Sequence, residues 1–187
     1  MLNAFAEAAL ELIHITLKLR NGVLFQECIV HIAGRWEIQS GSGKLSKREV
    51  LENNIDIFRI VTNVCSELNN SILQVNHHLF VVSVRQELPL DDEADALADF
   101  EYGMDPIRNP KFYRTLKQSV DEQIEEDGDD ASVTLTSLRN HLEFIIKSNL
   151  SLDKTGYAPG EGDYSHYFLS AKIKDEDMPW DATEIDW

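Results

Sequence analysis

Three short segments hold most of the negative charge of this 187-residue chain, and they restrict which residues can form a core. Residues 87–105, 121–130 and 175–187 carry 21 of the 33 acidic residues and contain no Lys or Arg. The remaining residues have a formal net charge of +5, whereas the whole chain carries −16. Because burying unpaired carboxylates is costly, we expect these segments to lie largely outside the core.

The length and a hydrophobic content of 43% are enough for one domain with a substantial core. We expect a single domain over residues 1–174, with acidic loop insertions at 89–108 and 121–130. Residues 175–187 form an acidic tail with two tryptophans, which we expect to lack structure of its own.

The composition also indicates a compartment. The apolar run at the N-terminus is interrupted by Glu7 and Glu11, unlike a signal peptide, and no apolar run approaches the ~18–20 residues of a membrane span. Cys28 and Cys65 fall on apolar faces and are too few for a disulfide framework, so we expect buried free thiols. The sequence therefore predicts a cytoplasmic protein that does not bind membranes.

The clearest local pattern predicts a β-hairpin over residues 12–32. Apolar residues alternate with polar ones before Asn21-Gly22, the pair typical of a two-residue type I′ turn. This register would bury one face of the first strand, formed by Ile13, Ile15, Leu17 and Leu19.

Other segments complete an α+β prediction. Apolar spacing and caps indicate helices over residues 2–10, 47–70, from 110 to about 124, and 133–148. Alternation and β-rich composition indicate strands over 35–38, 79–88 and 164–174. We expect an antiparallel or mixed sheet of four to five strands, with helices packed on one face.

Motifs for catalysis or cofactor binding are incomplete. The run Ser40-Gly41-Ser42-Gly43-Lys44 lacks the first Gly and the final Ser or Thr of a phosphate-binding loop. The acidic segment from Asp91 has Ala96 where a calcium loop requires Gly. No His pair has the four-residue helical spacing of a zinc site. We therefore expect no metal, no cofactor and no catalytic residue.

The helix after Pro110 carries its charges in an unusual order. It begins with Lys111, Arg114 and Lys117 and ends in the acidic run 121–127, the reverse of what its dipole favours. A local rule broken in this way suggests a functional surface. In the tail, tryptophans among acids are typical anchors for a basic partner.

These features predict a non-enzymatic acidic module that binds a basic protein, such as an inhibitor, an immunity protein or an anti-defence protein. Its negative charge should repel nucleic-acid phosphates, so no direct nucleic-acid binding is expected. The alternatives are a constitutive subunit or adaptor of a larger complex, and a small hydrolase that uses a carboxylate-bound metal. The predicted partner-binding residues are Asp91, Asp92, Glu93, Asp95, Asp99, Glu101, Asp105, Glu125, Glu126, Asp127, Trp180 and Trp187.

Overall fold

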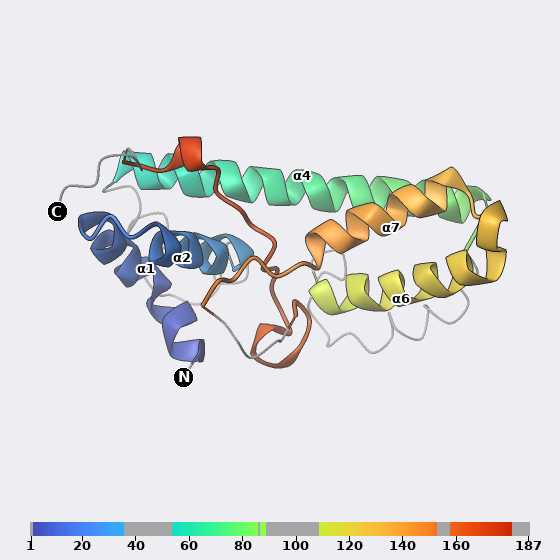
Figure 1. The fold of residues 1–187 in the computed structure, drawn as a ribbon, viewed down its shortest axis with the longest axis horizontal. Coiled ribbons are helices and arrows are strands. Elements are labelled where there is room, and N and C mark those ends of the chain that lie inside the picture. The colour runs from blue at the N-terminus through green and yellow to red at the C-terminus, as the bar shows by residue number, and fades with distance from the viewer. Residues whose placement is uncertain (1, 36–53, 86, 89–108, 153–157, 181–187) are drawn as a thin grey trace. The chain divides into compact units, whose positions relative to one another are not determined.

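The regular structure of this protein is helical. A computed structural model describes residues 2–35, 54–85, 87–88, 109–152 and 158–180 (Figure 1). Within these ranges there are α-helices and short 3-10 helices and no β-strand. The predicted α+β fold, with its sheet of four to five strands, is therefore wrong.

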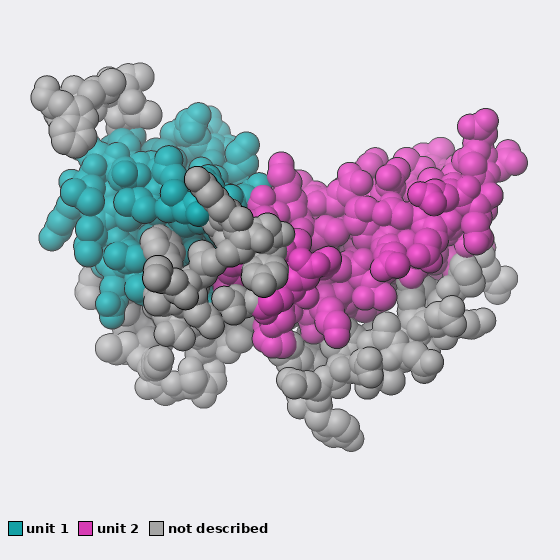
Figure 2. All heavy atoms as spheres, turned by 60° about the horizontal axis from the view of Figure 1, so that its bottom comes forward, with its two compact units in different colours: residues 1–67, 149–156, 169–187 teal, residues 68–148, 157–168 magenta. Residues whose placement is uncertain are grey.

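The chain forms two compact units, coloured separately in Figure 2. Unit 1 consists of Met1–Glu67, Asn149–Gly156 and Leu169–Trp187. Unit 2 consists of Leu68–Ser148 and Tyr157–Phe168.

Two helices of unit 1 replace the predicted hairpin. Helix α1 (Leu2–Lys18) includes the predicted helix 2–10 and continues well beyond it, and α2 (Gly22–Gly34) packs beside it (Figure 1). The Asn21 side chain accepts a hydrogen bond from the Leu24 N–H at 3.0 Å. Asn is favoured both in tight turns and as a helix N-cap, and here it caps α2.

The burial pattern of α1 has helical spacing. Ala9, Ile13 and Thr16 are buried, and their separations of four and three residues place them on one face. Ile15 and Leu19, which the hairpin would have buried, are 50% and 57% exposed. The alternation of apolar residues in this segment therefore does not mark the buried face.

Helix α4 (Ile55–Arg85) covers two segments for which we predicted different structures. The Asn54 carboxamide accepts a hydrogen bond from the Ile57 N–H near its start. The predicted helix 47–70 is correct from Ile55 onward, but the predicted strand 79–88 is wrong because the helix continues to Arg85. Val75 and Val82 are fully buried and seven residues apart, so packing on one helical face overrides their β-propensity.

Two helices of unit 2 confirm their predictions. Helix α6 (Pro110–Asp127) begins at the predicted cap, where the Asn109 side chain accepts from the Lys111 N–H at 2.9 Å. Helix α7 (Val133–Ile145) is capped by Ser132 and packs beside α6 (Figure 1). The buried core of unit 2 comprises Leu68, Ile72, Val75, Val82, Leu88, Tyr113, Leu116, Val120, Leu135, Leu138, Leu142, Ile145 and Phe168.

The predicted last strand, 164–174, is also wrong. A 3-10 helix, η4 (Gly162–Tyr164), precedes a buried segment that has no neighbouring strand among the described residues. Asn149 donates hydrogen bonds to this segment that a neighbouring strand would otherwise supply. Its backbone N–H donates to the Leu169 carbonyl at 2.9 Å, and its side-chain amide donates to the Ser170 carbonyl at 2.7 Å. A further 3-10 helix, η5 (Asp175–Asp177), follows.

Some predictions fall outside the described residues. These are residues 36–38 of the predicted strand, the run 40–44, the part of the predicted helix before Asn54, and the acidic insertion 89–108.

Candidate functional site

The predicted partner-binding residues are divided by what the structure describes. Trp187 and the first acidic group, Asp91, Asp92, Glu93, Asp95, Asp99, Glu101 and Asp105, lie outside the described residues. Glu125, Glu126 and Asp127 are described in unit 2, and Trp180 in unit 1. The candidate site therefore consists of the second acidic segment, residues 121–130.

That segment is the end of α6 followed by the 3-10 helix η3 (Gly128–Asp130). Glu125, Glu126 and Asp127 are all exposed, as is Glu122 one turn earlier. The Gln118 amide donates to Glu122 at 3.2 Å, and the Gln123 amide donates to Asp127 at 2.9 Å. None of these four carboxylates forms an ion pair with a Lys or Arg of the described chain.

Asp121 differs from its acidic neighbours because its charge is compensated. Its carboxylate pairs with Lys117 on the same helix and with Arg139 on α7, where the nitrogen–oxygen distance is 2.8 Å. Sequence reasoning missed this ion-pair network because Arg139 approaches α6 only through the packing of α7. Among the described residues, ion pairs therefore compensate the acidic run of α6 at Asp121.

The helix dipole separates the other acids into two groups. The last turn of α6 ends at Gly128, where carboxylates oppose the partial negative charge of the helix end. Asp129 and Asp130 lie just before α7, whose N-terminal end favours negative charge. Glu125 and Glu126, in this last turn, are consequently not stabilised by the dipole.

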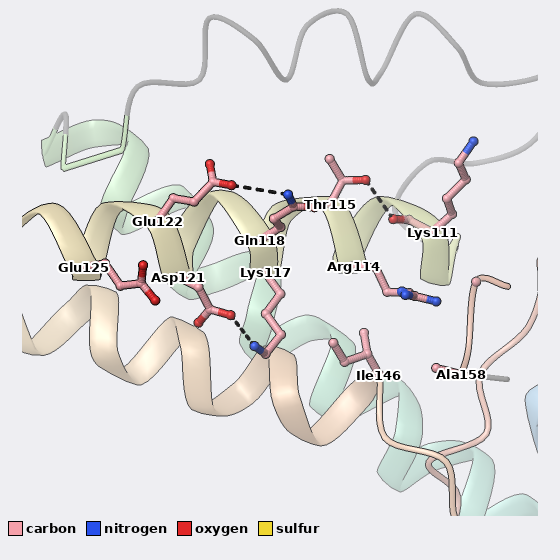
Figure 3. A pocket seen from close by; sticks show the side chains of 11 residues that line it. Lys111, Arg114, Thr115, Lys117, Gln118, Asp121, Glu122, Glu125, Ile146 and Ala158 are labelled. Carbon is pink, nitrogen blue, oxygen red and sulfur yellow. Dashed lines mark hydrogen bonds and ion pairs between the residues drawn. The ribbon is translucent and has the colours of Figure 1, made fainter. Parts of the chain in front are cut away.

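A groove of about 610 Å³ runs along the side of α6 (Figure 3). Lys111, Arg114 and Lys117 line its first half, and Asp121, Glu122 and Glu125 line its second half. Ile146 and Ala158 contribute apolar surface beside the basic half (Figure 3). The groove therefore changes from positive to negative along the helix axis.

The wall of the basic half is held by an ion pair between Arg114 and Glu161. The Arg114 hydrogen bond, together with one from the Ala158 N–H at 3.2 Å, lowers the pKa of the Glu161 carboxyl. Gly160 has a φ of +87°, and a Cβ there would lie 2.8 Å from the Lys111 backbone nitrogen. The loop 158–162 thus packs directly on the first turn of α6.

Trp180 has a structural environment of its own. Its ring packs against Phe25 of α2, a fully buried residue of the same unit. The tail as far as Trp180 therefore folds back onto unit 1, and this indole is partly buried.

A polar cluster joins α4 to α7 in unit 2. The His78 Nδ1 bonds to the Gln74 carbonyl at 2.8 Å, so it carries the proton, and the Nε2 then accepts from the Ser137 hydroxyl at 3.2 Å. The His141 ring lies 4.6 Å from that of His78. Burial and the neighbouring His78 lower the pKa of His141.

Both cysteines are buried free thiols, as the sequence predicted. Burial, with a smaller effect from the neighbouring Glu27, raises the pKa of Cys28 to about 12, so its thiol is protonated at neutral pH. Within the described ranges, no group of three His, Cys, Asp or Glu side chains is arranged to hold a metal ion.

Comparisons with family models, with curated proteins and with solved structures find no match for this chain. Among the described helices, none has the length and apolar character required to cross a membrane.

Proposed function

We propose that this protein is a non-catalytic binding protein that docks the acidic end of α6 onto a basic surface of a protein partner. The supporting observation is the exposure of Glu122, Glu125 and Glu126 in the last two turns of α6, without an ion pair to a Lys or Arg of the described residues. Such charges cost folding free energy, by ~0.3–1 kcal/mol each at a helix terminus. A cation on the partner would pair with these carboxylates and offset their unfavourable interaction with the helix end, which would favour binding.

The groove beside these residues would fix the orientation of a bound partner. A basic partner segment would meet Glu122 and Glu125 at one end of the groove, and any acid on that segment would meet Lys111 at the other. Complementary charge of this kind raises the association rate and fixes the orientation of the partner. The same acidic end would repel nucleic-acid phosphates, which favours a protein as the partner.

A comparative pull-down tests the proposal. Wild-type protein, the variant E122Q/E125Q/E126Q and the control D175N/E176Q/D177N serve as baits, and captured proteins are quantified by mass spectrometry. The control removes the same charge from η5, whose three acids are also exposed. We expect a basic protein that is captured by the wild type and the control and lost from the α6 variant.

The kinetics of the recovered pair provide the second measurement. Neutralising α6 should slow association and flatten its dependence on salt, because exposed charges are screened over ~8–10 Å at physiological ionic strength. The same variant should be at least as stable as the wild type, since it removes charges that oppose the helix dipole. If no protein shows the expected capture pattern, or if association does not depend on salt, the proposal is wrong.

A further inference from the structure

A stretch of α4 is free of formal charge. No Asp, Glu, Lys or Arg occurs between Asn69 and Val84, although these four residue types make up 27% of the whole chain. Exposed helix faces in soluble proteins normally carry charged side chains. The outer face of α4 in unit 2 therefore does not have the composition of a solvated surface.

Large apolar side chains lie on that face. Leu73, Phe80 and Val84 are 62%, 67% and 66% exposed. At about 100° per residue they lie within roughly 40° of one another, and the exposed His77 at the edge widens this arc to about 60°. We call these four residues the α4 stripe.

The neighbouring helices of unit 2 occupy other sides of α4. Helix α7 is joined to it through His78 and Ser137, and through the Arg85 guanidinium, which donates to the Thr134 hydroxyl at 2.9 Å. Helix α6 is joined to it through the Tyr113 hydroxyl, which donates to Asn76 at 3.0 Å. The buried residues Val75 and Val82 lie between these two contacts, on the side opposite the stripe.

The spacing of the stripe is self-complementary. The separations of four, three and four residues are those of the a and d positions of two heptads. If two copies of the helix pair antiparallel about a two-fold axis, Leu73 faces Val84 of the other copy and His77 faces Phe80. Such isologous contacts are the commonest way in which soluble proteins dimerise.

The residues that flank the stripe allow this pairing. The adjoining positions are Gln74, Asn76, Val81 and Ser83, none of which is charged. Two copies can therefore approach here without close like-charge contacts, despite the net charge of −16 on each chain. A strongly basic partner, in contrast, would find no carboxylate between Asn69 and Val84.

We propose that the α4 stripe is a homodimer interface in which α4 helices of two copies pack antiparallel. Two heptads bury less surface than the ~1,200–2,000 Å² of standard stable interfaces, so the dimer should be weak and dependent on concentration. The inference is independent of the proposed function. The stripe and the acidic end of α6 are different surfaces, and loss of one should leave the other intact.

Sedimentation equilibrium of the full chain, over about 5 to 500 µM, tests this proposal. We expect the wild type to shift from monomer to dimer as its concentration rises. Phe80→Glu should remain monomeric throughout, because it places a charge at the centre of the interface. Phe144→Glu is the matched control, since Phe144 is 53% exposed on α7, and it should dimerise like the wild type.

Disulfide trapping tests the antiparallel register. Leu73→Cys mixed with Val84→Cys should form an oxidised heterodimer in preference to either homodimer, because a disulfide needs Cα atoms ~4.4–6.8 Å apart. The native cysteines are buried and should not interfere. A wild type that is monomeric at every concentration would overturn the proposal. It would also be overturned by a dimer that survives Phe80→Glu, or by equal trapping in all combinations.

Discussion

The indole of Trp180 packs edge-on against the ring of Phe25, with ring centroids 5.2 Å apart and planes inclined by 70°. Phe25 is fully buried in α2, so the contact fixes the segment after η5 onto the helical part of unit 1. The sequence alone predicts that Trp180 is an anchor for a partner. The geometry favours a role in stability instead.

Trp180→Ala should therefore destabilise the protein. A partly buried aromatic contact of this type contributes less than the ~3–5 kcal/mol of a fully buried Trp, and we expect a loss of about 1–3 kcal/mol. Chemical denaturation monitored by circular dichroism measures this loss. Trp180→Phe keeps an aromatic ring against Phe25 and should recover much of it, whereas an unchanged midpoint for Trp180→Ala would exclude the structural role.

Local signals predicted α6 and α7. Asn109 with Pro110 predicts the start of α6, because a cap satisfies backbone donors within its own first turn. Apolar spacing alone predicts α7, and its Ser132 cap was missed. The sequence failed at Asn21-Gly22, where an Asn that can initiate either a turn or a helix caps α2. Only the packing of α1 against α2 decides between these two structures.

Substitutions of Ile13 and Ile15 distinguish directly between a hairpin and two helices in this segment. In a hairpin both residues would share the buried face, but in α1 Ile13 is fully buried and Ile15 is half exposed. Ile13→Asp should cost several kcal/mol, because a charge without a partner enters the core, on the order of 3–5 kcal/mol for a buried, uncompensated charge. Ile15→Asp should change stability by about 0.5 kcal/mol or less, as is typical of surface positions.

Urea denaturation of both variants, followed by circular dichroism, gives the comparison. The far-ultraviolet spectrum of the Ile15→Asp protein should remain helical. If the two substitutions are equally damaging, the helical arrangement of this segment is wrong.

The candidate site was only partly predictable. The acidic run at the end of α6 is visible in the sequence, because charge order along one helix requires no tertiary information. The pairing of Asp121 with Arg139, and the groove wall formed by Glu161, depend on residues brought to α6 by other segments. Likewise, the strand predicted at 164–174 failed because Asn149 satisfies carbonyls that a neighbouring strand would otherwise have used.

Glu27 makes a contact that the sequence did not reveal. Its buried carboxylate on α2 accepts the backbone N–H groups of Ser151 at 2.9 Å and of Leu152 at 3.3 Å. Glu27→Gln weakens this charge-assisted acceptor and should lower stability by ~1–3 kcal/mol. Glu11→Gln, at an exposed position of α1, is the control and should have little effect. Thermal melts of both variants measure the difference, and equal melting temperatures would contradict the prediction.

His141 should make the stability of the protein sensitive to acid. Its pKa in the folded protein lies below the usual value of 6.5, because burial and the adjacent His78 disfavour the charged ring. The unfolded chain therefore takes up a proton first as the pH falls through 6.5, and the folded state loses stability in that range. Above this range both states hold a neutral imidazole at position 141 and the effect vanishes.

Urea unfolding at pH 5, 6, 7 and 8 tests this effect. The quantity compared is the slope of the unfolding free energy against pH, not its absolute value. Carboxylates contribute to the pH dependence of every variant. The contribution of the His141 imidazole is therefore obtained from the difference between the wild type and a variant that lacks it. His141→Gln should show a shallower loss of unfolding free energy between pH 7 and 5 than the wild type. His166→Gln, at an exposed position, should follow the wild type. If the His141→Gln and wild-type slopes coincide, the contact between the His78 and His141 rings does not oppose protonation, and the acid sensitivity has another origin.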